Sequence, residues 1–351
     1  MKAKALEVDL KNAEKIRRFL IQHSYLIKDL ELIKENGKIY FPVREIGNIP
    51  LKQDLYQVSE RNFKEVKIIP TSYKDLISLP KDLQKELPTS YDIIGKIALI
   101  KLNKELLKNK KEIGDALLRV NKSLETVCLV NPVRGELRTR AIEIIAGKKQ
   151  TKTIYFEYGS KFIIDIKKVY FSPRLANERK RVSNLVHKGE IIVDMFAGVA
   201  PFSIIIGKFS NPKIIYTVDK NKEAVEFAKT NIKINNLLDK IEVICLDAKN
   251  IESIFTNKDN KADRIIMNLP FSAHMYFENA LKIAANKCII HYYDILKIED
   301  IKQRKNYLIE IAKKMNFKLE KMVIHKIKTY APREFYIGID ITAKKINADV
   351  A

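Results

Sequence analysis

The chain has 351 residues, 46% of them hydrophobic, and 65 Lys and Arg residues against 43 Asp and Glu, which gives a formal net charge of +22 at pH 7. This length exceeds one ordinary domain and predicts two or three folded units, each with enough apolar residues for a core. Solubility needs only a balance of positive and negative side chains, so this excess of Lys and Arg predicts a polyanionic partner. A general enrichment in lysine would also supply part of the excess positive charge.

The cysteines and the apolar segments restrict the class of protein further. Cys128, Cys245 and Cys288 lie far apart and form no Cys-x-x-Cys pair, so neither a zinc ribbon nor a disulfide framework is predicted. The N-terminus lacks the apolar core of a signal peptide, and no apolar run is long enough to span a membrane. We therefore expect a cytoplasmic protein with no membrane partner and no metal site, and we also expect a monomer.

Two small units are predicted in the first half of the chain. Residues 1–62 combine a helix around Ile16 and Leu20 with a strand at 38–43, which indicates a small α/β domain. Residues 63–89 carry three prolines among charged residues, the composition of a linker. Residues 90–168 predict an α+β middle domain, with one strand at 92–102, a helix over 104–120, a strand at 126–130, a short helix over 139–146 and strands at 151–159 and 161–171.

From residue 169 to residue 351, strands alternate with helices, the pattern of a parallel sheet covered on both faces. The strands are expected at 191–197, 214–219, 241–247, 264–270, 288–294, 321–328 and 334–342. Seven strands that end in an antiparallel pair are typical of the Rossmann-type methyltransferase domain. The predicted fold class is therefore α/β, with this domain at residues 169–351.

A ligand site is predicted where the first of these strands ends. Its sequence runs from Asp194 through Gly198 to Pro201, directly before a helical segment. Glycine at such a turn lets the backbone approach a ligand, and ligands bind at the carboxyl ends of parallel strands. Only one glycine of a G-x-G-x-x-G pattern is present, which argues against a pyrophosphate cradle.

Two further acids end the next two strands. Asp219 is placed to accept hydrogen bonds from ribose hydroxyls, and Asp247 is placed to meet an adenine amino group. Either acid alone could be a helix N-cap or a turn residue. Together with Asp194 they put three carboxylates at one edge of the predicted sheet, which favours a nucleoside-containing ligand.

The fourth strand ends in the tetrad Asn268-Leu-Pro270-Phe271. Proline after a strand fixes the backbone, so the amide of Asn268 can be aimed at a planar amine or a ring nitrogen. Such tetrads resemble those of S-adenosylmethionine enzymes that methylate nitrogen in bases or amides. The alternative is a turn with no ligand role.

Several segments together resemble one family, the archaeal and eukaryotic tRNA (guanine-N1)-methyltransferases that act at position 37, beside the anticodon. The segments are SYDIIGKIALI at 90, GELRTR at 135, VYFSPRLANERKRV at 169, VDMFAGVAPFS at 193, NLPFSAH at 268, HYY at 291 and YAPREF at 330. They occur in the family order, whereas the first sixty residues match only in general character. The family usually has glycine where Ala200 stands, which puts the tightness of that turn in doubt.

The resemblance implies methyl transfer from S-adenosylmethionine to guanine N1 in tRNA, with the N-terminal domain at the tRNA elbow and the other domains on the anticodon stem-loop. It implies that Glu178 is the general base, Arg138 a positively charged stabiliser and Asn268 an orienting amide. Cofactor contacts are expected at Asp194, Phe196, Ala197, Gly198, Asp219, Asp247, Asn268 and Pro270. Substrate contacts are expected at Tyr170, Pro173, Arg174, Arg179, Arg140, Phe271 and Arg333.

The chemistry of guanine supports these roles. N1 carries a proton at neutral pH, so a carboxylate is needed to remove it, and an arginine facing O6 stabilises the charge that develops there. From the residues alone, however, Glu178 lies in a charged run typical of a solvated helix face, and Arg138 and Arg140 could simply bind phosphates. The basic residues Arg174, Arg179, Lys180, Arg181 and Arg333 are interpreted as a clamp on the RNA backbone, and His274, His291 and His325 as pocket walls or core residues.

Three alternatives stay open at this point. A relative of the family also methylates carbon 7 of a tricyclic wyosine intermediate, and the sequence does not exclude that second activity. A wyosine-pathway transferase moves the aminocarboxypropyl arm of the same cofactor instead, but Glu178 and Asn268 favour methyl transfer. A non-catalytic RNA-binding protein is the third alternative, and the intact acids Asp194, Asp219 and Asp247 argue against it.

Overall fold

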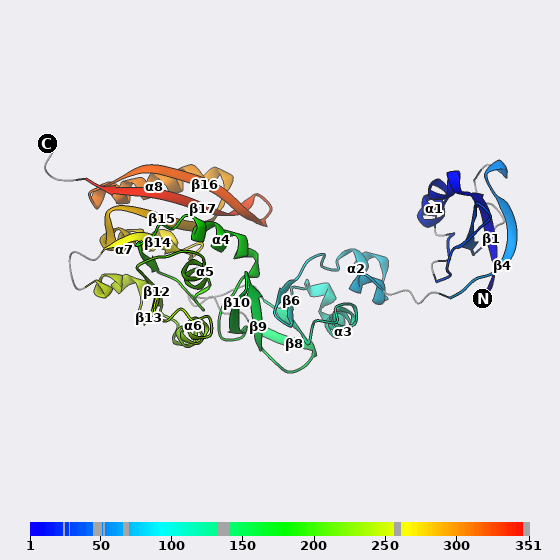
Figure 1. The fold of residues 1–351 in the computed structure, drawn as a ribbon, viewed down its shortest axis with the longest axis horizontal. Helices are drawn as coiled ribbons and strands as arrows, with labels where there is room; N and C mark the ends of the chain where they lie inside the picture. Colours follow the sequence, from blue (N-terminus) through cyan, green and yellow to red (C-terminus); the bar gives the residue numbers. More distant parts are fainter. Residues whose placement is uncertain are drawn as a thin grey trace. The chain divides into compact units, whose positions relative to one another are not determined.

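The structure is a computed structural model that describes residues 1–23, 25–27, 29–44, 51, 53–65, 70–131, 141–255 and 261–346. It divides into an N-terminal unit, residues 1–76, and a C-terminal unit, residues 77–351 (Figure 1). The boundary falls inside the segment expected to be a linker, where the structure has a 3-10 turn, Tyr73–Leu76, and a short helix α2, Lys81–Lys85. The expected middle and Rossmann-type domains lie within one unit.

The N-terminal unit is a four-stranded antiparallel sheet with one helix. The strands are ordered β2-β3-β1-β4, with β1 at Lys2–Asp9, β2 at Ile33–Glu35, β3 at Lys38–Val43 and β4 at Gln57–Asn62. Helix α1, Ala13–Gln22, buries Ile16 and Leu20 against the sheet residues Leu6 and Phe41. The helix around Ile16 and Leu20 and the strand at 38–43 are therefore both present as predicted.

The middle part of the chain differs from its prediction in two places. The single strand expected at 92–102 is a hairpin, β5 at Asp92–Ile94 and β6 at Ile97–Ile100, because Gly95 turns the chain with a φ of +56°. The short helix expected over 139–146 was wrong: residues Ile142–Gly147 form strand β8, paired with β7, Thr126–Val130. Its isoleucines favour a strand, and the pairing overrides a local helical pattern.

A helix and a two-stranded hairpin complete this region. The four strands form a sheet in the order β5-β6-β7-β8, and helix α3, Lys110–Val120, follows a 3-10 turn at Lys104–Asn109. Strands β9, Lys152–Glu157, and β10, Ser160–Asp165, form a separate antiparallel hairpin. The helix expected over 104–120 is thus confirmed, and its first part is a 3-10 helix.

The seven-stranded sheet expected in the last part of the chain is confirmed. Its order is β13-β12-β11-β14-β15-β17-β16, with the first five strands parallel and β17 antiparallel to both of its neighbours. The strands are β11 Ile191–Asp194, β12 Ile214–Asp219, β13 Ile241–Cys245, β14 Ala262–Met267, β15 Ala284–Lys297, β16 Phe317–Ala331 and β17 Glu334–Lys345. The helices are α4 Ala176–Asn184, α5 Pro201–Phe209, α6 Lys222–Ile234, α7 Phe277–Ile283 and α8 Ile301–Lys314.

Two hydrophobic cores cover the two faces of this sheet. One contains residues of α5 and α6 and continues into the middle region through Leu99, Cys128 and Phe162. The other contains residues of α7 and α8, such as Phe277 and Leu308. The first core therefore joins the middle region to the large sheet, and the edge formed by the carboxyl ends of the parallel strands stays open for a site.

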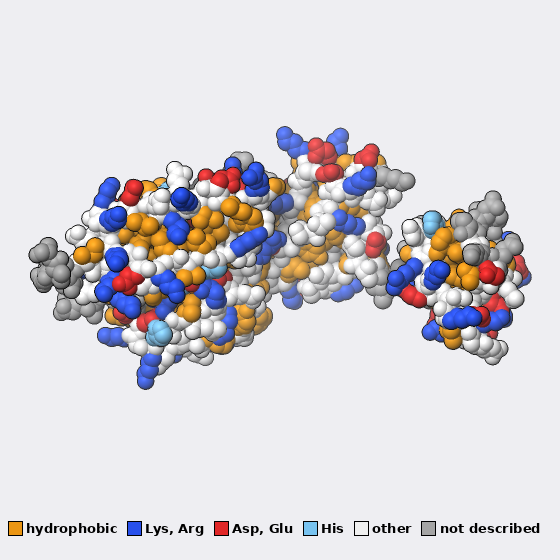
Figure 2. All heavy atoms as spheres, turned by 90° about the horizontal axis from the view of Figure 1, so that it is seen from above, with side chains coloured by type: hydrophobic (Ala, Val, Ile, Leu, Met, Phe, Trp, Pro, Cys, Tyr) orange, Lys and Arg blue, Asp and Glu red, His pale blue; other side chains and the backbone are white. Residues whose placement is uncertain are grey.

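The surface and the cysteines agree with the expectations from composition. Lysine and arginine side chains are distributed over the face of each unit that Figure 2 shows. All three cysteines are free, Cys128 and Cys288 being buried and Cys245 exposed, as their spacing predicted. No helix among the described residues is long and apolar enough to cross a membrane.

Candidate active site

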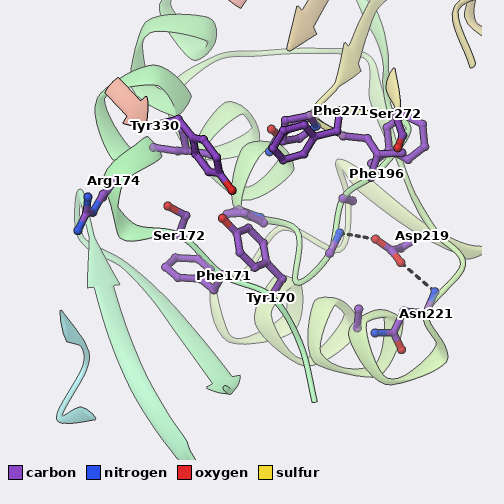
Figure 3. Close-up of a pocket in the computed structure, with 18 of the residues that line it drawn as sticks. Tyr170, Phe171, Ser172, Arg174, Phe196, Asp219, Asn221, Phe271, Ser272 and Tyr330 are labelled. Atoms are coloured by element: carbon purple, nitrogen blue, oxygen red, sulfur yellow. Dashed lines mark hydrogen bonds between the residues drawn. The ribbon is translucent and has the colours of Figure 1, made fainter. Parts of the chain in front are cut away.

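A pocket of about 730 Å³ lies in the C-terminal unit at the carboxyl ends of β11, β12 and β14 (Figure 3). Its wall includes the turn after β11, the ends of β12 and β13, and the loop after β14. Residues 88–92 of the middle region, residues 170–172 before α4 and residues 328–330 of β16 complete it. The pocket therefore occupies the edge of the sheet at which the sequence predicted a ligand.

The turn after β11 is held by the carboxylate of Asp219. The backbone N–H of Gly198, whose φ is +56°, donates to Asp219 Oδ2 at 2.7 Å, and the N–H of Asn221 donates to Oδ1 at 2.8 Å (Figure 3). Burial raises the pKa of Asp219 above its ordinary value. Ala200 takes a φ of +65° at the start of α5, so this turn accepts alanine where the family usually has glycine.

Asp194 lies behind the turn and not in the pocket wall. Its side chain is almost fully buried, and Oδ2 accepts a hydrogen bond from Ser203 Oγ at 3.0 Å. Burial raises the pKa of Asp194 to about 7. Asp194 thus ties β11 to α5 through Ser203, while its Oδ1 is buried without a hydrogen-bond partner among the described residues. Its expected contact with a cofactor stays a prediction.

The other expected cofactor residues do line the pocket. Asp247 Oδ1 accepts the N–H of Lys249 at 2.9 Å and so caps the 3-10 helix Ala248–Ile254, while the residue remains in the pocket wall. Phe196 packs edge-on against Tyr276, with ring centroids 5.1 Å apart. Ala197 and Pro270 are wall residues as well. The N-cap alternative for Asp247 and a ligand role for it are therefore compatible.

The tetrad after β14 is held by hydrogen bonds with Tyr336 and Asp294. Asn268 accepts a hydrogen bond from the Tyr336 hydroxyl of β17 through Oδ1, so its carbonyl end is engaged. Phe271 has a φ of +75°, and its N–H donates to Asp294 Oδ1 at 3.2 Å. Asp294 is fully buried and forms an ion pair with Arg304 at 3.1 Å. Asp294 was missed by the sequence reasoning, although an acid in the apolar strand at 288–294 was a signal for it.

Aromatic side chains surround the mouth of the pocket. Phe271 and Tyr330 are 49% and 52% exposed, and their rings meet edge to face with centroids 5.6 Å apart. Tyr170 lies across from them, whereas Arg174 points away from the other labelled side chains (Figure 3). Arg174 forms an ion pair with Asp92 of β5. Tyr330 is a second wall residue that the sequence analysis did not single out.

The remaining substrate residues are dispersed. Pro173 begins the short 3-10 turn Pro173–Leu175 and is not part of the wall. Arg333 is exposed in the turn between β16 and β17, three residues after Tyr330. Arg138 and Arg140 lie outside the described residues. The structure therefore brings only part of the expected substrate set to the pocket.

Arg179 does not have the environment of a phosphate ligand. Its side chain is 1% exposed and donates from Nε to Glu157 Oε1 at 2.7 Å and from Nη2 to Glu157 Oε2. The guanidinium also donates to the carbonyl of Ser172 and lies over the ring of Phe171. Arg179 is among the residues that line the pocket, but its guanidinium is engaged in a buried ion pair between β9 and α4, and its expected contact with RNA stays a prediction.

Glu178 is neither on a solvated helix face nor in the pocket wall. Its side chain is 6% exposed and accepts hydrogen bonds from Arg181, Tyr293 and His325. Although burial acts to raise it, these donors lower the pKa of Glu178 to about 2. The ring of Tyr293 lies 6.2 Å from that of Tyr336, the partner of Asn268. Two tyrosines thus separate the expected base from the pocket.

Three domain families match successive parts of the chain. The TRM5/TYW2 methyltransferase domain matches residues 153–320, the TYW2 N-terminal domain residues 73–151 and the tRNA methyltransferase 5 N-terminal domain residues 5–48. The tRNA (guanine(37)-N(1))-methyltransferase Trm5b of Pyrococcus abyssi is 37% identical over 338 residues, 96% of this chain and 98% of that protein. The tRNA(Phe) (4-demethylwyosine(37)-C(7)) aminocarboxypropyltransferase of Methanocaldococcus jannaschii is 32% identical over 73% of this chain and 98% of its own length.

Solved structures extend the similarity to the fold. The structure described as a complex of aTrm5 and tRNALeu has a TM-score of 0.70 at 33% identity and covers 98% of this chain and 99% of that one. The structure of Methanocaldococcus jannaschii TYW2 in complex with AdoMet has a TM-score of 0.57 at 26% identity and covers 73% of this chain and all of that one. The similarity therefore includes the N-terminal unit in the first case and a smaller part of the chain in the second.

Proposed function

Because the chain belongs to the TRM5/TYW2 methyltransferase family, we propose that it transfers a methyl group from S-adenosylmethionine to N1 of guanosine 37 in tRNA. The similarity to a tRNA (guanine(37)-N(1))-methyltransferase over 96% of the chain carries this proposal. The pocket supports it, because it joins the Gly198 turn, Asp219, Asp247 and the Asn268 tetrad in one wall. The net charge of +22 suits a polyanionic substrate in the cytoplasm.

The wall residues fit the proposed cofactor. Phe196 and Leu246 offer an apolar surface beside Asp247, whose Oδ2 has no hydrogen-bond partner within the described residues and can accept from an adenine amino group. Each oxygen of Asp219 already accepts one backbone N–H, but a carboxylate has further lone pairs for ribose hydroxyls. When bound, the cofactor supplies an already activated sulfonium methyl group.

The chain's own residues have three tasks in this scheme. Glu178 removes the N1 proton. Because Tyr293 and Tyr336 separate its carboxylate from the pocket, this role requires the carboxylate to move past them to the base. Asn268 presents its amide to the base edge, since its carbonyl end is held by Tyr336. Arg138 stabilises the charge on O6, an assignment that follows from the family resemblance. Phe271 and Tyr330 form the wall at the mouth.

The aminocarboxypropyl transfer of the wyosine pathway is the second candidate. A relative with that activity is 32% identical, but it corresponds to only 73% of this chain. The match to the tRNA methyltransferase 5 N-terminal domain at residues 5–48 favours the methyltransferase. A second methylation, at carbon 7 of a wyosine intermediate, would use the same pocket and the same cofactor, and its test requires tRNA that already carries that intermediate.

The test is to incubate unmodified tRNA with the protein and labelled S-adenosylmethionine and to identify the altered nucleotide by mass spectrometry. We expect one methyl group on N1 of guanosine 37. An aminocarboxypropyl increment would support the second candidate, and the absence of any product together with RNA binding would support a non-catalytic protein.

The role of Glu178 is tested in the same assay. Glu178→Gln should lower turnover by about 10²-fold or more, since general base catalysis contributes that much, while tRNA affinity changes little. Glu226→Gln on α6 is a matched control, because Glu226 is an exposed acid of the same domain. Undiminished turnover of Glu178→Gln would exclude Glu178 as the base.

A further inference from the structure

Two aromatic side chains at the mouth of the pocket are half-exposed although they are large and apolar. Phe271 and Tyr330 both line the pocket (Figure 3). They come from different segments, the loop after β14 and the end of β16, yet their ring centroids are 5.6 Å apart, with 75° between the ring planes. Exposed aromatic surface at the mouth of a pocket is typical of a recognition site, because a ligand can cover the ring faces.

The backbone of Phe271 has a conformation that an aromatic residue rarely adopts. Its φ of +75° lies in the left-handed region, where the Cβ atom of an L-residue is crowded by the backbone. A non-glycine residue keeps such a conformation only where its surroundings impose it, and such residues are concentrated at binding and active sites. The ring of Phe271 is therefore held at the mouth against the conformational preference of its own backbone.

Asp294 of β15 is the group that holds this backbone. Its carboxylate is fully buried, and Oδ1 accepts the N–H of Phe271 at 3.2 Å and that of Ile295 at 2.9 Å. Oδ2 accepts the hydroxyl of Tyr292 at 2.6 Å and pairs with Nε of Arg304 of α8 at 3.1 Å. Because donors from β15 and α8 fix the carboxylate, the loop after β14 is attached to a rigid anchor behind the pocket wall.

The hairpin of β16 and β17 contacts the tetrad at both ends. Tyr336 of β17 donates its hydroxyl to Asn268 Oδ1, and Tyr330 of β16 contacts the ring of Phe271. An amide that can meet a polar edge and rings that can cover a flat face thus belong to one loop and are supported by one hairpin. A nucleobase has such an edge and such a face, and extruded bases are recognised through hydrogen bonds to the edge and stacking on aromatic side chains.

The adenine of the proposed cofactor is the other flat group that this pocket would hold. It has a separate apolar surface, since Phe196 and Leu246 lie in the wall with Asp247. Phe271 and Tyr330 are therefore left for the substrate. The two rings are steeply inclined to each other, so a base lies parallel to only one of them and meets the other at an angle. Phe271 follows Asn268 by three residues and is the ring next to the amide.

We infer that the target guanine stacks on the ring of Phe271, that Tyr330 closes the side of this platform, and that Asp294 is a positioning residue that acts through Phe271. The inference rests on the proposed function, because it specifies how that pocket holds its base. Asp294 does not touch the substrate in this scheme. It fixes the strained backbone from which the platform projects.

Tryptophan fluorescence provides a direct test, because the chain contains no tryptophan. Phe271→Trp creates a single reporter whose emission is quenched when a base stacks on it. We expect tRNA with guanosine 37 to quench this emission by about half or more, and the same tRNA without the base of nucleotide 37 to have little effect. Phe209→Trp, at the far end of α5, is the matched control and should respond equally to both RNAs.

Methylation kinetics test the platform without a reporter. Phe271→Ala should lower kcat/KM for tRNA by about 10- to 100-fold, which corresponds to the loss of one stacked base. Phe271→Tyr keeps the ring and should stay within about threefold of the native protein. Calorimetric affinity for S-adenosylmethionine should change by less than about twofold in both variants, because the cofactor has its own apolar surface.

The role of Asp294 is measured in the Phe271→Trp protein. Asp294→Leu removes the acceptor of the Phe271 N–H and should abolish most of the quenching by tRNA well below the unfolding midpoint. Asp294→Asn retains an acceptor oxygen and should restore most of the quenching. A merely structural role of Asp294 would lower the midpoint in both variants and leave the quenching of the folded protein unchanged.

The outcomes separate this inference from the proposed function. If the native protein methylates guanosine 37 while Phe271→Ala keeps native kcat/KM, or if the reporter is quenched equally without the base, the platform is refuted and the methyltransferase stands. If the native protein forms no methylated product but the reporter still requires the base, the platform stands and the proposed reaction fails. Quenching that requires the base, together with a loss of activity in Phe271→Ala, supports both.

Discussion

Replacing Glu157 by Gln should unfold the C-terminal unit at a much lower temperature without weakening tRNA binding. Glu157 and Arg179 are 2% and 1% exposed at their side chains, so the variant leaves the guanidinium buried beside a neutral amide. Breaking a buried pair on one side typically costs about 3–5 kcal/mol. At about 2–4 °C per kcal/mol for domains of roughly this size, the midpoint of thermal unfolding should fall by about 10 °C.

The assay combines thermal unfolding with tRNA affinity measured well below the lowered midpoint. Glu226→Gln on the surface of α6 should leave the midpoint unchanged. The double replacement Glu157→Leu with Arg179→Met removes both charges and should recover most of the lost stability, because an apolar pair has no unpaired ion.

A different pattern would refute the reasoning. If Arg179 contacted a phosphate, Arg179→Gln would weaken tRNA binding, reduce its salt slope by about one and leave stability largely intact. An unchanged unfolding midpoint in Glu157→Gln together with that loss of affinity would show that the buried ion pair does not persist in solution.

Two predictions concern the proposed ligands. Asp219→Ala should weaken S-adenosylmethionine binding far more than tRNA binding, because it removes the acceptor of the Gly198 N–H and a ribose contact; calorimetry measures both affinities, and equal losses would contradict the assignment. The logarithm of the tRNA binding constant should fall steeply and linearly with the logarithm of the salt concentration, because Lys and Arg contacts release counterions. A filter-binding titration measures this dependence, and a flat response would contradict the proposed polyanionic partner.

Local patterns were sufficient to predict the seven-stranded sheet. The alternation of strands and helices, the glycine after β11 and the acids at the ends of β12 and β13 are signals carried by short segments. The carboxyl ends of parallel strands meet at one edge, so Asp219, Asp247 and Asn268 could be assigned to one pocket before their positions were known. Strand β8 was missed because the segment also has a local helical pattern, which its pairing with β7 overrides.

The charged run at 177–181 shows that a local pattern does not predict which charged side chains are buried. Glu178 and Arg179 are buried, whereas Lys180 extends over the ring of Phe209. Arg179 pairs with Glu157, which lies 22 residues before it, and Arg181 pairs with Asp340, which lies 159 residues after it. Only the packing of α4 against β9 and β17 distinguishes these neighbours, so a solvated face and an RNA clamp were the natural interpretations of the sequence.

Asp340 of β17 connects charged groups of the large sheet to helix α4. Its carboxylate accepts hydrogen bonds from Arg181 and lies 2.6 Å from Nδ1 of His291, whose Nε2 lies 2.7 Å from Arg264. Arg264 in turn pairs with Glu190, and Arg181 with Glu178. Removal of any one of these charges leaves a neighbouring charge without its partner, so we expect these positions to tolerate substitution in concert and not singly.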